Sequence, residues 1–351
     1  MSAEPCPCCA PPWQLKANVR PAFCTVKCYN HSGSLLWIGD QFQTVTGLAV
    51  DDNGNAYTCF GGSPYNANIS SFNIVEKRNS DGLLTAAIPG QKLSAPELGV
   101  GHFKSTAGLR IASSPAGIYF IRQTNGDTGG ATSDPNRVDK YSSSLDFSLT
   151  MPQTNGSSSF TATLPMTHIG ARGTLVAITA LSGSTQHAVA AWTNDLLNNV
   201  IAAGVRPAGS STTGLEMGNA GQIYVSHSNG SSSFSTWSSS PVITSQTGAI
   251  PLWGIAVSGS SVFGLHLNGT PITGITRKGG TGGINWKIGA NESGAYAIAD
   301  DTPPKPTLRF FDSSNNLIWS DPWGNNSTDY INEIVVTSDR VYAAGVRVQL
   351  L

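Results

Sequence analysis

Charged residues are scarce in this chain of 351 residues. They make up 12% of the sequence, whereas a typical soluble domain carries about twice that share. The formal net charge is -1, so the chain lacks the excess of lysine and arginine that attracts nucleic acid or an anionic membrane surface. No apolar run approaches the roughly 18 residues that a membrane-spanning helix needs. These absences argue against a nucleic-acid partner and against membrane insertion.

The N-terminal stretch MSAEPCPCCAPPW lacks the basic start and the apolar segment of a secretory signal peptide. We therefore expect a location in a virion or on an extracellular surface to be reached without a Sec signal peptide. Glycine is abundant instead, with 39 residues, and serine, threonine and asparagine fill much of the remaining sequence. This composition favours many short strands joined by tight turns, and the 39% of hydrophobic residues can supply their core.

One hairpin pattern recurs along the chain. Residues 310–320, FFDSSNNLIWS, combine an apolar run, a polar turn and a second apolar run that reaches a tryptophan. Related segments carry Asn, Asp or Gly at the first turn position, Gly or Asn three residues later and an apolar residue two further on. Clear copies are 27–39, 75–88 and 275–288, and weaker copies are 138–150, 190–202 and 234–246. The segment 190–202 also fits a short helix.

A second hairpin alternates with this outer one. Its best copy is GLAVDDNGNAYTCF, residues 47–60. Further copies are 108–121, 214–227, 254–267 and 332–345, and degenerate copies are 168–181 and 287–300. The strands of these inner hairpins are small and apolar on both faces, which is typical of strands buried between sheets.

One inner and one outer hairpin make a four-stranded blade, and the repeat spacing is that of a β-propeller. The sequence therefore predicts an all-β chain with a cysteine- and proline-rich tail over residues 1–24 and a single propeller over 25–351. We expect seven four-stranded blades, with the ring closed by pairing of residues 25–40 with 331–346. Because the outer and inner patterns nearly overlap around residues 284–292, six or eight blades stay open.

The inner pattern, which begins at Gly47, resembles NHL-type propeller repeats. The outer pattern, with its terminal Trp37, Trp286 and Trp319, resembles the repeats of pyrroloquinoline-quinone (PQQ) propellers. The quinoprotein dehydrogenases of that superfamily hold Ca²⁺ and PQQ on the propeller axis beneath a pair of adjacent cysteines. This chain has such a pair, Cys8-Cys9, in its tail, and shows no Glu, Asn and Asp set that matches the calcium ligands. The resemblance therefore implies the fold, and a quinoprotein-like oxidoreductase is the alternative function.

Catalytic motifs are missing from the sequence. The six histidines show no metal-binding spacing, and neither a G-x-S-x-G elbow nor a P-loop occurs. His227 and His266 end inner strands, where a turn or core role is favoured over a role in the channel. The acidic clusters Asp51–Gly54 and Asp300-Asp301 are interpreted as structural, because the first fits a tight turn and the second lacks further calcium ligands. We expect no catalytic residue and no bound organic cofactor.

Cysteine is concentrated at the N-terminus. Five of the six cysteines precede residue 29, namely Cys6, Cys8, Cys9, Cys24 and Cys28. Their paired short spacings suit a Zn²⁺ site, and disulfides outside the cell would explain the same clustering. Both alternatives stay open, and either would pin the tail to the ring or to a partner. Cys59 stands alone in an inner strand and is predicted to be a buried thiol.

Long connections are predicted only in the first two blades, at residues 61–72, 89–106, 122–137 and 151–167, all on one face of the ring. Long loops on a rigid scaffold are where binding residues concentrate. The candidate partner-binding residues are Tyr65, His102, Phe103, Lys104, Arg122, Asp127, Asp134, Arg137 and Phe160. We expect a contact surface there for a partner protein or a host-surface glycan.

Two functions follow from these features. The favoured one is a non-enzymatic structural or adhesion propeller, a component of a phage tail or capsid surface that contacts other structural proteins of its assembly. The low charge, the closed ring and the cysteine-rich tail support it, and virion proteins leave the cell by lysis without a signal peptide. The alternative is a quinoprotein-like oxidoreductase or another propeller enzyme.

Overall fold

The computed structural model describes residues 22–41, 44–61, 73–89, 92–93, 104–126, 134–151, 166–182, 186–196, 199–205, 212–227, 232–237, 244–247, 252–266, 275–278, 285–300, 306–324 and 329–348. Within these ranges every regular element is a β-strand. The described part of the chain therefore contains no helix that is long and apolar enough to cross a membrane.

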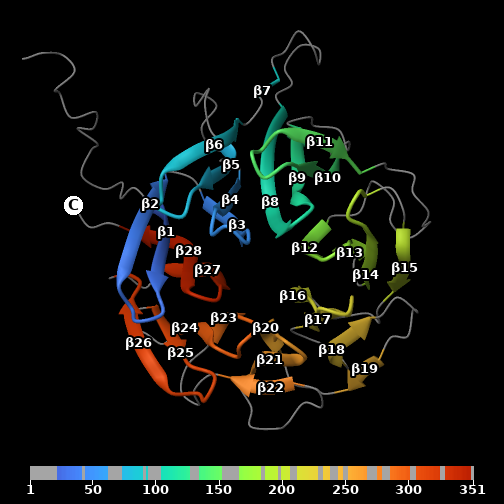
Figure 1. Ribbon diagram of the computed structural model, residues 1–351. Helices are drawn as coiled ribbons and strands as arrows, with labels where there is room; N and C mark the ends of the chain where they lie inside the picture. Colours follow the sequence, from blue (N-terminus) through green and yellow to red (C-terminus); the bar gives the residue numbers. More distant parts are fainter. Residues whose placement is uncertain are drawn as a thin grey trace, which may run out of the picture.

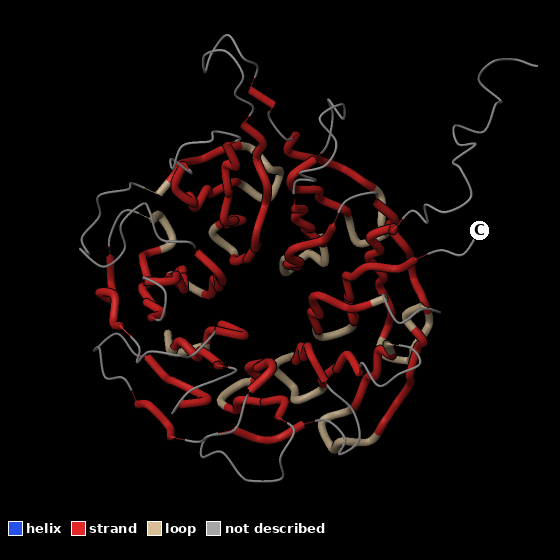
Figure 2. The backbone as a smooth tube through the Cα atoms, turned by 180° about the vertical axis from the view of Figure 1, so that it is seen from behind, coloured by secondary structure: helices blue, strands red, loops and turns tan. Residues whose placement is uncertain are grey.

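The described strands form seven sheets that stand around a common axis (Figures 1 and 2). The innermost strands contact one another in the order β3, β8, β12, β16, β20, β23, β27 and back to β3. Each sheet runs outward from its innermost strand, so the arrangement is a single all-β propeller. This confirms the predicted fold class.

Three blades contain the first half of the chain and its C-terminal end. The terminal blade consists of β27 (Tyr330–Val336), β28 (Arg340–Val348), β1 (Ala22–Asn30) and β2 (Leu35–Gln41), counted outward from the axis. The next consists of β3 (Thr44–Val50), β4 (Ala56–Gly61), β5 (Asn73–Arg78) and β6 (Leu84–Pro89). The third consists of β8 (Lys104–Ser114), β9 (Gly117–Gly126), β10 (Asp134–Tyr141) and β11 (Phe147–Thr150), with the short β7 (Lys92–Leu93) beside β8.

Three further blades contain most of the second half. The first consists of β12 (Met166–Arg172), β13 (Leu175–Ser182), β14 (Gln186–Thr193) and β15 (Asn199–Val205). The second consists of β16 (Thr212–Met217), β17 (Ile223–His227), β18 (Ser232–Trp237) and β19 (Thr244–Thr247). The third consists of β23 (Asn285–Ala290), β24 (Tyr296–Asp300), β25 (Thr307–Phe311) and β26 (Leu317–Pro322). The pair β14–β15 shows that residues 190–202 form a hairpin and not a helix.

The remaining sheet, β20 (Leu252–Ser258), β21 (Ser261–His266) and β22 (Ile275–Lys278), differs from the prediction. The outer hairpin predicted over residues 275–288 does not form, because β22 pairs in parallel with β21. The residues from Asn285 onward form β23 instead, where Ile288 is buried between blades. The expectation of seven four-stranded blades is therefore wrong here: among the described residues six blades have four or more strands, and this sheet has three.

The two ends of the described chain lie in one sheet. Strand β1 pairs antiparallel with β28 from Ala22 opposite Val348 to Asn30 opposite Arg340. The pairing begins three residues earlier than the predicted boundary of the propeller at residue 25, so Ala22–Cys24 belong to the terminal blade and not to the tail.

The tight turns are built by side chains that accept hydrogen bonds from the backbone. Asp51 Oδ1 accepts from the backbone N–H groups of Asn53 (3.0 Å) and Asn55 (2.9 Å), and Asp51 Oδ2 accepts from Tyr57 at 2.9 Å. Asn79 and Asp312 repeat this arrangement in the outer hairpins. The Asp51–Gly54 segment is therefore an Asx-type turn, as predicted.

Tryptophans on the outermost strands join neighbouring blades. Trp37 of β2 donates its Nε1 hydrogen to the Ser80 carbonyl at 3.1 Å, and its ring lies against Gly82 in the β5–β6 turn of the next blade. Trp319 of β26 lies in the same way against Gly33 of the β1–β2 turn. Both glycines have positive φ, +84° and +90°, so they form the turn and leave space for the indole. The core continues between the blades: Val26 and Tyr342 of the terminal blade pack in one cluster with Leu48 and Phe60.

We predict that Gly82→Ala lowers the free energy of unfolding by about 2–4 kcal/mol, because the new Cβ meets both a left-handed backbone and a tightly packed ring. That Cβ would lie 2.5 Å from Cγ of Trp37. The matched control is Gly173→Ala, which also has positive φ but nothing within 4 Å, so only the backbone cost of about 1 kcal/mol is expected. Chemical denaturation measures both values. Equal losses in the two variants would contradict the role of Trp37.

Candidate functional site

A β-bulge interrupts each innermost strand at the same place. In all seven strands one residue is left out of the pairing with the second strand of the sheet. The residues that directly follow the bulges are Gly47, Arg110, His168, Gly214, Gly254, Lys287 and Glu333. Bulges re-aim the side chains beside them, and these seven residues line one cavity of about 130 Å³ on the propeller axis. We call them the axial ring.

The four side chains of the axial ring that are not glycine bear charges or can be charged. Glu333 lies between two basic groups: its Oε1 is 3.4 Å from Lys287 Nζ and 3.9 Å from Arg110 Nε. Arg110 reaches Glu333 across Gly47, whose missing side chain leaves the path open. Arg110 Nη1 also donates to the Thr46 carbonyl at the neighbouring bulge, at 2.5 Å. The arrangement therefore holds two cations around one carboxylate.

Glu216 adds a second carboxylate to the axis. It lies on β16 two residues beyond Gly214, where the other innermost strands carry Ala, Gly or Val, and it lines the same cavity. Burial and, to a smaller extent, the nearby charge of Glu333 raise the pKa of Glu216 from 4.5 to about 7, against the lowering effect of Arg172 and Lys287. Part of its side chain still faces the solvent of the channel. Glu216 is therefore a proton-exchanging group near neutral pH.

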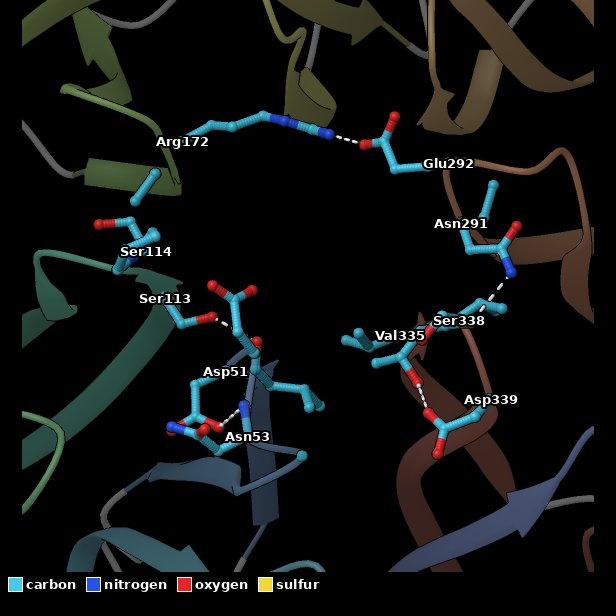
Figure 3. Close-up of a pocket in the computed structure, with 18 of the residues that line it drawn as sticks. Asp51, Asn53, Ser113, Ser114, Arg172, Asn291, Glu292, Val335, Ser338 and Asp339 are labelled. Atoms are coloured by element: carbon cyan, nitrogen blue, oxygen red, sulfur yellow. Dashed lines mark hydrogen bonds and ion pairs between the residues drawn. The ribbon is translucent and has the colours of Figure 1, made fainter.

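One mouth of this channel opens on the face of the tight turns, which we call the turn face. A cavity of about 730 Å³ lies there, lined by the turns of the inner hairpins. Figure 3 shows Arg172, at the end of β12, paired with Glu292 of the β23–β24 turn. Glu292 also accepts a hydrogen bond from Asn219 at 3.0 Å. These contacts link blades on different sides of the ring across the mouth.

The other mouth opens on the opposite face, where the innermost strands begin, which we call the loop face. Its cavity of about 470 Å³ is lined by Arg110, His168, Thr212, Thr213, Trp253, Lys287, Ala299, Asp300, Pro306, Tyr330, Ile331 and Asn332. Asp300 pairs with Arg309 at 3.1 Å, so its charge is already balanced. Arg110, His168 and Lys287 supply the basic side chains of this lining.

The two mouths therefore differ in charge. The turn-face cavity is lined by four carboxylates, of which Glu292 pairs with Arg172 and Asp339 lies 3.4 Å from Arg340 Nε, so Asp51 and Asp52 supply its net negative charge. The loop-face cavity is lined by Arg110, Lys287 and His168 and by the balanced Asp300. An anion is thus attracted to the loop face and repelled from the turn face.

Metal binding gains no support from the described residues, since no group of three or more His, Cys, Asp or Glu side chains is placed to hold an ion. In the channel, basic groups stand between the carboxylates: Lys287 and Arg110 hold Glu333, and Arg172 lies near Glu216.

The predicted cysteine site is only partly within the described chain. Cys6, Cys8 and Cys9 lie outside the described residues. Cys24 and Cys28 both lie on β1. Cys28 is a free thiol that is buried against Trp37 and Tyr342, and burial raises its pKa to about 11. The predicted zinc or disulfide tie of the N-terminal cysteines stays a prediction.

Cys59 is a free, buried thiol, as predicted. Its burial raises its pKa to about 12, and its Sγ lies 3.3 Å from Thr46 Oγ1. It is part of the packing between blades rather than a reactive group.

The predicted partner-binding residues that the structure describes lie in one blade. Tyr65, His102, Phe103, Asp127 and Phe160 lie outside the described residues. Lys104 and Asp134 are the first residues of β8 and β10, and Arg122 and Arg137 are opposed in β9 and β10. Lys104 and Arg122 belong to strands because the β8–β9 hairpin is longer than predicted, and Asp134 and Arg137 because β10 begins before the predicted outer hairpin.

Arg122 has a structural partner: its Nε lies 2.7 Å from Oδ2 of the buried Asp139. Arg137 is exposed. Of the predicted set with described side chains, Arg137 is the residue available for contact with a partner.

Sequence reasoning missed the axial ring. A usable signal was present, because Arg110, Glu216 and Lys287 interrupt otherwise small and apolar inner strands. The sequence alignment of the inner hairpins treated Gly108 and Asn332 as the residues equivalent to Gly47. In the structure the residues equivalent to Gly47, which directly follow the bulges, are Arg110 and Glu333. Likewise, His168 lines the channel, whereas the side chains of His227 and His266 are outside the described part of the structure.

Comparisons with known proteins bear on the fold alone. No family model matches the chain, and no curated protein matches it in sequence. Among solved structures it is similar to Raptor from Chaetomium thermophilum, with a TM-score of 0.52 and 9% identity over 93% of this chain and 30% of Raptor. The β-propeller domain of the Trilobed protease from Pyrococcus furiosus gives 0.49 and 8% over 86% and 91%. Apo AztD from Citrobacter koseri gives 0.47 and 10% over 92% and 98%.

We predict that Glu216→Gln stabilises the protein at high pH only. Because the folded-state pKa of about 7 lies above the ordinary 4.5, the folded wild type retains a proton that the unfolded chain releases, and it loses stability as pH rises through this window. The variant should match the wild type below pH 4.5 and exceed it above pH 7 by about 1–2 kcal/mol, allowing for solvent in the channel.

Denaturation at a series of pH values tests this expectation. Glu292→Gln is the matched control, because its side chain is 55% exposed and a near-constant difference from the wild type is expected. A Glu216→Gln difference that does not change with pH would show that Glu216 carries no raised pKa.

Proposed function

We propose that the protein is a non-enzymatic structural or adhesion propeller, a component of a larger protein assembly such as the tail or capsid surface of a phage virion. It attaches to neighbouring protein subunits along its outer rim. One observation carries this proposal, namely an arc of exposed apolar side chains on the outermost strands of four consecutive blades.

The arc follows the outer edge of the ring. Its members are large apolar side chains that each come soon after a tight turn, and all are more than two-fifths exposed. They are Leu35, Leu36 and Ile38 on β2, Leu83 and Leu84 at the start of β6, Phe147 on β11, and Leu317 and Ile318 on β26. The exposed fractions reach 59% for Phe147 and 64% for Leu83. We call this set the apolar rim.

The four blades of the apolar rim are neighbours, since their innermost strands β23, β27, β3 and β8 contact one another in turn. Their outermost strands lie on the outside of the ring (Figure 1), and no described strand pairs with their outer edges. An open strand edge with apolar side chains is a template for an added strand. Exposed apolar residues that were scattered at random would not form such an arc. The partner that suits the rim is a protein subunit that places an apolar, extended segment along it.

A structural role also needs a rigid ring, and we infer that the pairing of β1 with β28 closes it. The nine paired positions of these strands support this inference, as do the contacts that connect β27 with both β23 and β3. Asn332 of β27 additionally donates to the Val45 carbonyl of β3 at 2.6 Å.

Removal of residues 329–351 tests the closure. The truncation deletes β27 and β28, so β1 and β2 would lose their blade and the core shared by Val26, Leu48 and Tyr342 would open. We expect insoluble protein or a transition without cooperativity. A soluble truncated chain with the melting temperature of the full chain would refute closure by these strands.

The alternative function is a quinoprotein-like oxidoreductase or another propeller enzyme. The charged groups in the axial channel favour it, because sequence reasoning found no clustered acid and base whereas the structure brings Arg110, Glu216, Lys287 and Glu333 to one axis. The neighbouring genes discriminate the two functions. Tail or capsid genes support the structural role, and a cytochrome or PQQ-synthesis gene supports the enzyme.

We predict that replacing rim residues with threonine weakens attachment without unfolding the ring. In the variant Leu36→Thr/Ile38→Thr/Leu84→Thr/Ile318→Thr all four side chains are exposed, so the cost should be about 0.5 kcal/mol or less for each. The test is co-purification of each variant with the products of the adjacent genes, expressed together with it.

The control variant carries Thr85→Ser and Ser320→Thr, which change exposed polar residues on β6 and β26. Capture of a structural gene product by the wild type and the control, but not by the rim variant, is the expected outcome. Capture that survives the four substitutions would place the attachment surface elsewhere.

A further inference from the structure

The loop-face mouth of the channel has the features of a binding site for a small molecule. Its cavity of about 470 Å³ is within the size range of ligand pockets. Its walls come from six different sheets, because Arg110, His168, Thr213, Trp253, Lys287 and Tyr330 lie on β8, β12, β16, β20, β23 and β27. A site built on the innermost strands of a packed ring is preorganised, which lowers the entropic cost of binding.

The charges at this mouth leave room for one anion. Lys287 and Arg110 are both directed toward the single carboxylate of Glu333, at 3.4 Å and 3.9 Å. Two cations around Glu333 give a net charge of about +1 as long as Glu216, the other carboxylate of the axis, is protonated, and His168 lines the same cavity. The cations keep contact with solvent, since the side chains of Arg110 and Lys287 are 32% and 25% exposed. A carboxylate that enters from the loop face would meet donors on Arg110 and Lys287 without displacing Glu333.

The opposite side of the mouth offers neutral polar and aromatic groups. Gly214 and Gly254 occupy the axial ring there. Thr212 and Thr213 contribute hydroxyl groups, and Trp253 contributes an aromatic surface. Tyr330 stands at the entrance with 40% of its surface exposed. Hydroxyl groups and aromatic faces together suit a ligand that has several hydroxyl groups on a compact ring.

We propose that the loop-face mouth binds an acidic sugar, with its carboxylate toward Arg110 and Lys287 and its hydroxylated ring between Thr213, Trp253 and Tyr330. The channel gives this ligand one direction of entry, because the carboxylates at the turn face repel it. The site is separate from the apolar rim, so its test can fail while the proposed attachment role stands.

Titration calorimetry on the full chain tests the proposal with defined probes. The acidic sugars are glucuronate, galacturonate and N-acetylneuraminate, and the comparison compounds are glucose, acetate and inorganic phosphate. We expect at least one acidic sugar to bind at least about tenfold more tightly than glucose and acetate, because both the charge and the ring contribute. If the acidic sugars, acetate and phosphate bind with equal affinity, the site binds anions without specificity and the proposal is overturned. The proposal is also overturned if none of the acidic sugars binds.

Variants locate the site. Lys287→Gln should weaken the acidic sugar by about 10–100-fold, since it removes a charged donor. Tyr330→Ala is the second variant, because its exposed side chain can be removed with little loss of stability, and it should weaken the acidic sugar without affecting acetate. Arg172→Gln, at the other end of the channel, is the matched control and should leave affinity within about twofold. Unchanged affinity in both Lys287→Gln and Tyr330→Ala would refute this location.

Discussion

The close packing of innermost strands around one axis is the constraint on which the rest of this structure depends. Each of these strands must pair with its own sheet and also contact the innermost strands of two neighbouring blades. A regular strand would keep the same side-chain alternation along its whole length. In every innermost strand a bulge shifts that alternation at the equivalent position. The side chains before the bulge and after it therefore face different surroundings.

Thr213 shows how the bulge joins blades. Its hydroxyl contacts Ser226 of its own sheet at 2.8 Å and donates to the Leu252 carbonyl of the next sheet at 2.5 Å. Arg110 and Asn332 likewise bind backbone carbonyls of β3. The polar groups freed by the interrupted ladders are therefore used between blades, and buried backbone groups gain partners as they must. The same irregularity that joins the blades also directs the axial ring toward the channel.

The sequence contained the blade pattern because turns have strong local chemistry. Asp51, Asn79 and Asp312 accept backbone hydrogen bonds within their own turns, so their spacing revealed both kinds of hairpin. The prediction failed over residues 275–288, where local signals for an outer return strand and an inner strand overlap. The inner strand forms there because β23 gains a partner in β24 and neighbours in β20 and β27. Such contacts between distant segments leave no local signature.

The candidate site was harder to predict for a related reason. A bulge shifts the side-chain alternation by one residue, so a repeat alignment without bulges assigns Arg110 and Glu333 to the wrong surface. Their proximity depends on the order of blades around the axis, which places Gly47 between them. The exposure of the apolar side chains on β2, β6, β11 and β26 could not be predicted from the sequence either, because a buried strand can have the same residues. To predict the axial ring and the apolar rim one must know the order of the strands and sheets, whereas the turns can be predicted without it.

Separation of the two candidate surfaces follows from the geometry of a propeller. The apolar rim lies on outermost strands, and the axial ring lies on innermost strands of the same sheets, with the inter-blade core between them. Changes at the rim therefore need not disturb the channel, since exposed edge residues share no side-chain contacts with the axis. The opposite charges of the two mouths depend on side chains from many blades, so they persist only while the ring is intact. In the function proposed above, a rigid ring would allow one chain to hold a protein neighbour at its circumference and to keep a polar site open at its axis.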